Sequence, residues 1–77
     1  MKLTPKLAEA LVRLRHLPEF KTFIEVVRED ELSAMNTAST SSKLSQVRRA
    51  QGEVAAFRAI LRAVDDAPAT LEKFNQR

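Results

Sequence analysis

Apolar residues recur at helical spacing along most of the chain, and the longest regular stretch runs from Lys43 to Val64. Within it, apolar side chains follow one another at steps of three and four residues, as on one face of a helix. This stripe consists of Leu44, Val47, Val54, Leu61 and Val64, with Phe57 and Ile60 beside it and with Gln51 and Arg58 interrupting it. Alanines occupy many remaining positions, and they favour a helix that a neighbour can approach closely. We therefore predict a helix over residues 43–65.

The N-terminal segment carries a second stripe and a clear helix start. Thr4 can accept hydrogen bonds from free backbone N–H groups, and Pro5 suits the first helical position. The stripe consists of Leu3, Leu7, Leu11, Leu14 and Leu17. Pro18 disfavours helical backbone at Leu17. These features predict a first helix over residues 5–16 and a break before Pro18.

A third stripe begins after Pro18 with Phe20, Phe23, Ile24 and Val27, and it predicts a helix over residues 18–36. Beyond Arg28 the pattern thins to Leu32, Ala34, Met35 and Ala38. The Ser- and Thr-rich segment 36–42 then favours a loop, because these side chains compete for helical hydrogen bonds. It is either an ordinary solvated connection or a tip that orders on a partner. Ser41 or Ser42 is the expected cap of the next helix.

The C-terminal segment is predicted to turn before a short last helix. Asp65 and Asp66 precede Ala67 and Pro68, a combination typical of a turn. Pro68 is acceptable in the first turn of a helix. The segment 67–75 is therefore expected to form a short helix that packs back through its apolar residues.

Together these elements predict an all-α protein with one domain over residues 1–77. Its expected architecture is an antiparallel helical hairpin with short flanking N- and C-terminal helices. The large apolar residues of the second stripe (Phe20, Phe23, Ile24 and Val27) would meet those of the central helix (Val54, Phe57, Ile60, Leu61 and Val64). The opposite end, residues 28–49, has few large apolar residues. That end must project into water or be covered by another molecule.

The length and composition favour association with other chains. A chain of 77 residues is only marginally able to bury its own core. It has no cysteine and one histidine, so it offers neither disulfides nor a usual set of zinc ligands. Small domains that lack both features often oligomerise. The candidate partner-interface residues are Leu32, Met35, Leu44, Val47, Gln51, Gly52, Ala55 and Ala59.

The net charge of +3 is distributed in bands. Residues 29–42 carry three acidic and no basic side chains, whereas residues 43–64 carry five basic and one acidic. Such bands suit contacts between subunits. An alternative is a small nucleic-acid-binding or regulatory protein, whose candidate contacts are Lys43, Arg48, Arg49, Arg58 and Arg62. These residues do not share one helix face, and a clustered basic patch is the usual footprint of a nucleic-acid site.

Sequence motifs for catalysis are missing. His16 is the sole imidazole that could serve as a base, and no glycine-rich phosphate loop is present. We expect no enzymatic activity, no catalytic residue, no metal and no cofactor. No apolar run is long enough to span a membrane, and charges interrupt the N-terminal apolar stretch that a signal peptide needs. An intracellular location is therefore the default expectation.

Two segments resemble small proteins encoded in the structural gene modules of tailed phages and prophages. They are LRHLPEFKTFIEVV (Leu14 to Val27) and RRAQGEVAAFRAIL (Arg48 to Leu61). The resemblance implies a virion-associated structural or assembly protein, repeated in a ring or shell near the capsid or the head–tail or portal junction. A third hypothesis is a scaffold or chaperone-like cofactor that is released after assembly. The resemblance further implies that the partners are subunits of a phage particle, including copies of the chain itself, and that its location is the virion or the host cytoplasm. The resemblance also implies that Gln51 and Gly52 lie at a tight helix contact; otherwise Gly52 is a tolerated imperfection in the helix.

Overall fold

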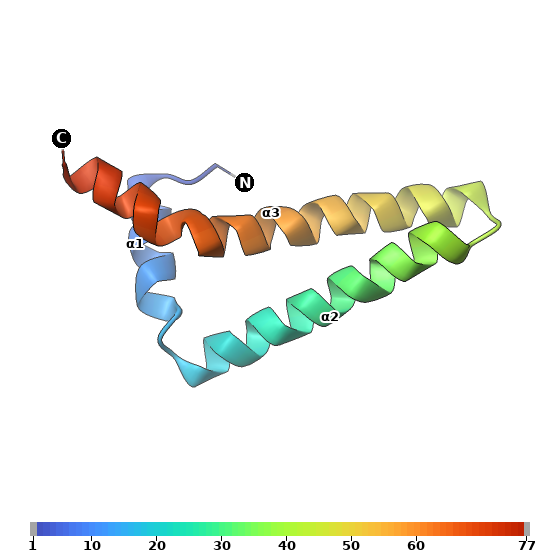
Figure 1. Ribbon diagram of the computed structural model, residues 1–77, viewed down its shortest axis with the longest axis horizontal. Helices are drawn as coiled ribbons and strands as arrows, with labels where there is room; N and C mark the ends of the chain where they lie inside the picture. The colour runs from blue at the N-terminus through green and yellow to red at the C-terminus, as the bar shows by residue number, and fades with distance from the viewer. Residues whose placement is uncertain (1, 77) are drawn as a thin grey trace.

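The computed structural model describes residues 2–76, which form three helices and no strand. They are α1 (Pro5–Leu14), α2 (Pro18–Thr40) and α3 (Leu44–Asn75). The two long helices run antiparallel, and α1 lies across the end of α3 that is far from the hairpin loop (Figure 1). The predicted all-α fold and its helical hairpin are confirmed. Met1 and Arg77, the ends of the predicted domain, lie outside the described residues.

Helix α1 begins as its sequence predicts and ends slightly earlier. The Leu7 backbone N–H donates to Thr4 Oγ1 at 3.2 Å, and Pro5 occupies the first turn. The helix ends at Leu14 rather than at His16. The chain needs a short turn there, because Leu17 must adopt the extended backbone that a following proline requires.

Helix α2 continues to Thr40, beyond the predicted end at residue 36. Hydroxyl groups that could have ended it donate instead to carbonyl oxygens one turn back: Thr37 to Ser33 at 3.2 Å and Thr40 to Asn36 at 2.7 Å. Such bonds leave the helical backbone intact. The prediction of a Ser41 or Ser42 cap is also wrong. Lys43 occupies the cap position of α3, and Ser41 Oγ accepts from the Lys43 N–H at 3.3 Å.

Helix α3 runs without interruption through Pro68, so the predicted turn at residues 65–68 and the separate helix 67–75 are wrong. An interior proline costs a helix roughly 3 kcal/mol, since it removes one hydrogen bond and crowds the preceding turn. Packing opposes this cost here: Ala63 and Ala67 are buried on α3, and Ala8 is buried on α1, which packs against it. The axis of α3 changes direction in its C-terminal part (Figure 1), as expected near an interior proline.

Small residues dominate the interior. Within residues 2–76 the buried residues are Ala8, Val27, Ala34, Ala50, Ala63 and Ala67, and no large side chain there is fully buried. Large apolar groups lie at the margins instead; Phe20 and Phe23, for example, stack at 5.9 Å between ring centroids, while Phe23 stays 50% exposed. Alanine allows helices to approach closely but buries little apolar area.

The molecule is extended and flat. It measures 50 × 27 × 14 Å, and its radius of gyration is 15.1 Å, whereas a compact domain of this length has about 11–12 Å. Its accessible surface is 5896 Å², compared with about 4,700 Å² for a typical folded monomer of this mass. The chain therefore exposes roughly 1,200 Å² more than a self-contained protein would.

Two regions differ in how many helices they contain. The base, residues 3–28 and 58–75, holds α1 together with the diverging ends of α2 and α3 (Figure 1). The arm, residues 29–57, consists of α2 and α3 alone and ends at the hairpin loop. The arm is thus a single layer of two helices with two open faces.

Candidate interaction surface

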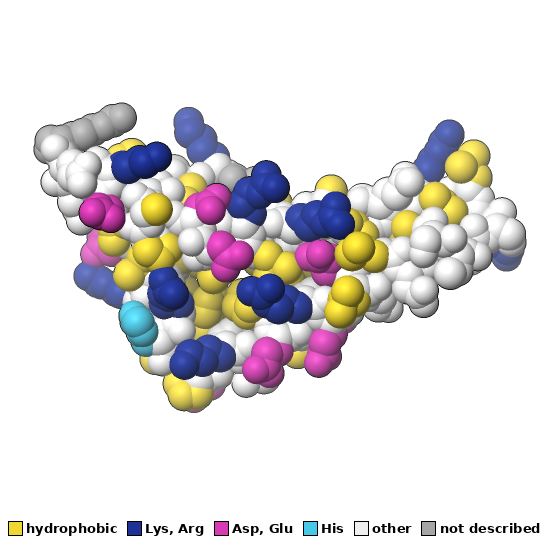
Figure 2. Space-filling model, viewed as in Figure 1, with side chains coloured by type: hydrophobic (Ala, Val, Ile, Leu, Met, Phe, Trp, Pro, Cys, Tyr) yellow, Lys and Arg dark blue, Asp and Glu magenta, His cyan; other side chains and the backbone are white. Residues whose placement is uncertain are grey.

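One face of the arm carries a shallow apolar groove of about 440 Å³. Its lining residues recur at steps of three and four along each helix, so each set lies on one side of its helix. They are Met35, Ala38 and Ser39 of α2 and Gln51, Val54, Ala55 and Arg58 of α3. Leu32, 66% exposed, lies one turn before Met35. In the space-filling view, hydrophobic side chains flanked by charged ones lie between the helices mainly toward the base, and the arm near the loop shows few of them (Figure 2).

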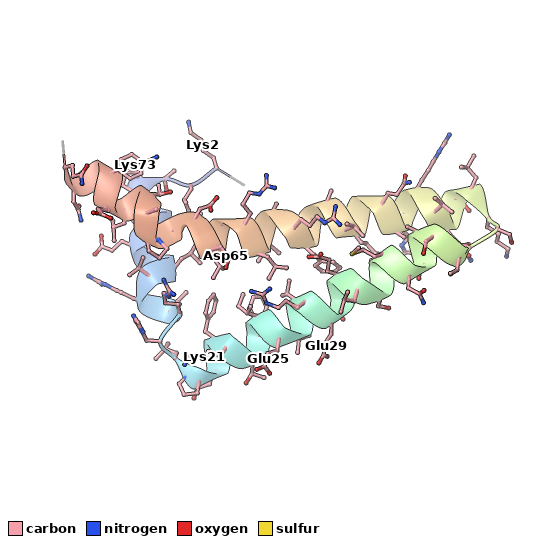
Figure 3. All side chains as sticks on the ribbon, in the orientation of Figure 1. Lys2, Lys21, Glu25, Glu29, Asp65 and Lys73 are labelled. Atoms are coloured by element: carbon pink, nitrogen blue, oxygen red, sulfur yellow. The ribbon has the colours of Figure 1, made fainter. Side chains whose placement is uncertain are left out.

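Ion pairs between the two helices bound this groove toward the base. Arg58 Nε lies 3.6 Å from Glu31 Oε1, and Arg58 Nη2 lies 3.7 Å from Met35 Sδ. Asp65 projects from α3 toward α2, where Arg28 Nη2 lies 4.0 Å from its carboxylate (Figure 3). These pairs place charged groups at the base end of the groove, next to its larger apolar residues, and toward the loop the groove is lined by Ala38, Ser39 and Gln51.

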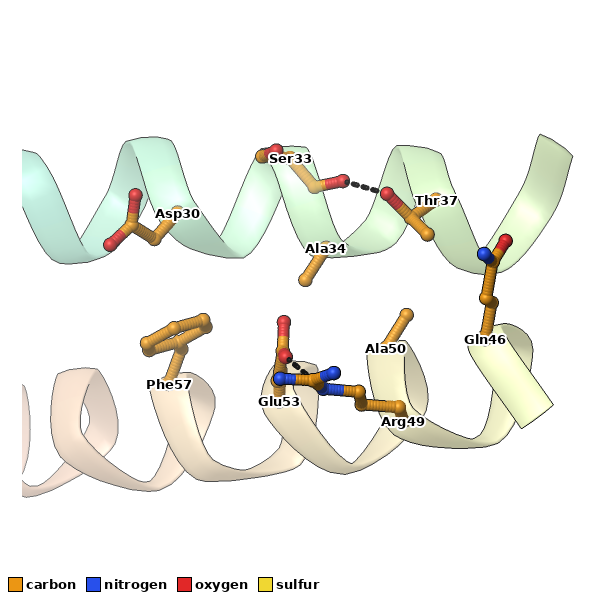
Figure 4. A pocket seen from close by; sticks show the side chains of 9 residues that line it. All are labelled: Asp30, Ser33, Ala34, Thr37, Gln46, Arg49, Ala50, Glu53 and Phe57. Atoms are coloured by element: carbon orange, nitrogen blue, oxygen red, sulfur yellow. Dashed lines mark hydrogen bonds and ion pairs between the residues drawn. The ribbon is translucent and has the colours of Figure 1, made fainter. Parts of the chain in front are cut away.

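The opposite face of the arm is polar (Figure 4). A cleft of about 380 Å³ is lined there by Asp30, Ser33, Ala34 and Thr37 of α2 and by Gln46, Arg49, Ala50, Glu53 and Phe57 of α3. Arg49 Nε pairs with Glu53 Oε1 at 3.5 Å on the same helix. Covering this face would require desolvation of several charges, which is costly unless each finds a partner. The apolar groove is therefore the better candidate for a protein contact.

The structure brings together some of the residues selected from the sequence as interface candidates. Met35, Gln51 and Ala55 share the apolar groove, and Leu32 lies beside them. The others do not join one contact surface. Leu44 is 63% exposed next to the loop, Val47 is half-buried, and Ala59 lines a cleft of the base with Leu3. A Cβ atom at Gly52 would meet nothing within 4 Å, so a tight helix contact there is not present within the chain.

Sequence reasoning missed other groove residues. The sequence pattern places Ala38 in the thin stripe after Arg28 and predicts Val54 in the core of the hairpin, whereas Val54 is only half-buried. Ser39 fell in the segment predicted as a loop, although it lies on α2. One signal in the sequence could have identified them: positions 38 and 39 continue the helical spacing of Leu32 and Met35. Using that signal requires a helix that extends past residue 36.

The basic residues of the nucleic-acid alternative are exposed but dispersed. Arg58 lines the apolar groove, Arg49 lines the polar cleft, and Arg62 lines a third cleft in the base. Arg48 and Lys43 are exposed near the loop end of α3. Two of the five arginine and lysine side chains are already paired with acids, Arg49 with Glu53 and Arg58 with Glu31. The structure gathers no single basic patch from these five residues.

The described part of the chain has few features that suit chemistry. His16 is exposed in the turn after α1. Among residues 2–76, no group of three or more His, Cys, Asp or Glu side chains is placed to hold a metal ion. None of the helices in that range combines the length and the apolar character needed to cross a membrane.

Comparisons of the chain with protein-family models, curated proteins and solved structures give no significant match. Two grounds for a functional proposal remain: the surface of the arm, and the resemblance carried by residues 14–27 and 48–61.

Proposed function

We propose that this chain is a non-enzymatic helical subunit of a larger assembly, which it joins by packing its arm against other chains. The observation that carries the proposal is the small apolar core of the single chain. Among residues 2–76 the buried ones are five alanines and one valine, while Leu32 and Leu44 of the arm are each more than half exposed. Large apolar side chains left in water favour burial by a partner.

The amount of exposed surface supports the same proposal. The excess over a typical monomer, roughly 1,200 Å², exceeds the roughly 800 Å² that one partner buries in a standard stable interface. A subunit that is flat and thin can bury such an area without a change of fold. Helix packing, rather than a pocket for a small molecule, is the mechanism that this shape serves.

The resemblance of residues 14–27 and 48–61 to small phage structural proteins supports a more specific role. In that role the chain is a virion-associated structural or assembly protein near the capsid or the head–tail or portal junction. It would act through repeated helix contacts, and no residue would perform chemistry.

Two measurements test this proposal. Sedimentation equilibrium of the purified chain should give a mass above the 8.7 kDa of one copy, and fractionation of source particles should place the chain with capsid or portal subunits. A stably folded monomer that never accompanies such particles would contradict the proposed function. Recovery of the chain only from unfinished particles would indicate a scaffold released after assembly.

A further inference from the structure

We propose that a second copy of this chain covers the apolar groove, packed antiparallel so that the two arms form a four-helix bundle. This inference rests on the proposed function, since it names the partner and the face of that assembly. The groove is the face defined by Met35 and Ala38 on α2 and by Val54 and Ala55 on α3.

The layer structure of the arm is the first argument. Stable helical folds bury an apolar stripe between at least two layers. The arm has one layer, and the residues that are buried between its helices are Ala34 and Ala50. A second arm laid on the groove supplies the missing layer, and the result is a four-helix arrangement of a common kind.

The molecule exposes enough surface for a dimer interface, and polarity identifies which face is covered. The excess exposed surface is large enough for one standard interface per copy. The opposite face carries Asp30, Arg49 and Glu53 around its cleft, and burial of these charges would oppose association. In the groove, Arg58 is already paired with Glu31 at 3.6 Å. A partner can therefore cover the apolar portion of the groove without leaving the Arg58 guanidinium unpaired.

Charge sets the orientation. Residues 32–53, the loop end of the arm, carry Lys43, Arg48, Arg49 and Glu53, a net charge of +2, and Glu53 is paired with Arg49. Residues 25–31 carry four acids and Arg28, a net charge of −3, and this value stays the same when the ion-pair partners Arg58 (of Glu31) and Asp65 (of Arg28) are included. Glu25 and Glu29 project from α2 away from α3, where a neighbouring chain can reach them (Figure 3). A parallel dimer sets like charges together, whereas an antiparallel dimer sets the positive segment of each copy beside the negative segment of the other.

A matched pair of variants tests the face. Met35→Asp introduces a carboxylate into the groove, and Thr37→Asp introduces the same group on the polar face of the same helix. By sedimentation equilibrium, Met35→Asp should raise the dimer dissociation constant at least tenfold, and Thr37→Asp should change it less than about twofold. Met35 is 37% exposed in the single chain, so circular dichroism should show unchanged helix content. The reverse order of effects would overturn the choice of face.

Spin labels test the orientation on a chain whose groove is intact. The sequence has no cysteine, so Lys21→Cys gives one labelled site in the base. With the symmetry axis near Met35, the helical rise places the two labels of an antiparallel dimer about 40 Å apart. Electron–electron double resonance should find that distance. The signal from label pairs at that distance should decrease above about 0.5 M salt, because salt screens the charges that hold the dimer together. A main distance under about 25 Å would overturn the antiparallel arrangement.

The outcomes separate this inference from the proposed function. A chain that is monomeric up to about 1 mM, yet sediments with large particles in its source, refutes the second copy and leaves the function standing, with another subunit in the groove. A dimer that Met35→Asp leaves intact refutes the face. A monomer that joins no particle refutes both proposals.

Discussion

The base and the arm use the same small-residue packing, but only the base has a third helix. In the base, Ala8 of α1 and Ala63 and Ala67 of α3 are all buried where these helices pack. In the arm, Ala34 and Ala50 are buried between two helices, and both outer faces are open. This difference shows that close contact between two helices is not sufficient to complete a core. A covering element is also required, and within the arm the chain does not supply one.

The largest effect on the single chain is expected where α1 covers α3. Ala67 is 0% exposed, so Ala67→Leu must force the helices apart and should lower the free energy of unfolding by about 1–3 kcal/mol. Urea denaturation at low protein concentration measures this change. Ala69→Leu, at an exposed position of the same helix, is the control and should change stability by less than about 0.5 kcal/mol. Equal effects at both positions would show that α1 does not pack there.

A stabilising substitution of intermediate size is expected in the arm. Gly52 has no positive φ and has open space around it, so Gly52→Ala should raise the free energy of unfolding by about 1 kcal/mol through helix propensity. Thermal denaturation monitored by circular dichroism measures the gain. Dimer affinity should stay the same, because Gly52 does not line the groove. If the alanine weakened association, a partner helix would have to cross at Gly52.

The smallest change in stability is expected from two ion pairs, one beside the groove and one on the polar face of the arm. Glu31 has a side chain only 18% exposed and joins α2 to α3 through Arg58. Glu53 is 48% exposed and pairs with Arg49 within α3. Glu31→Gln should lower the free energy of unfolding by about 0.5–1 kcal/mol, and Glu53→Gln by about 0.3 kcal/mol. Both losses are measured by urea denaturation in low salt, and a larger loss for Glu53→Gln would refute the interhelical role of Glu31.

Helical periodicity predicted much of the fold. The stripe after Pro18 was correct in its spacing: Val27 is buried, and Phe20 and Ile24 are half-buried. Phe23, which the same stripe placed in the core, lies at its edge and is 50% exposed. Thr4 and Pro5 correctly marked the start of α1, because a cap is a local interaction and the sequence contains all of its parts.

The errors arose where distant contacts override local rules. Pro68 reads as a helix break by itself, but α1 packs against the same part of α3 and the helix continues through a bend. Ser39 and Thr40 read as loop residues, yet their hydroxyls both donate to the Asn36 carbonyl oxygen. The sequence predicted only part of the candidate surface, because the rest depends on contacts between the two long helices. Spacing identified Met35 and Ala55, but the groove also needs Ser39 and Val54, which depend on how α2 and α3 face each other.

The most direct test of the claim that the arm needs a second chain is amide hydrogen exchange at a series of protein concentrations. Local protection reports the stability of each region, and a partner adds stability according to its concentration. We predict that backbone protection over residues 29–57 rises at least tenfold between dilute and concentrated samples, while protection over residues 58–75 changes little. Strong arm protection that does not depend on concentration would contradict the claim.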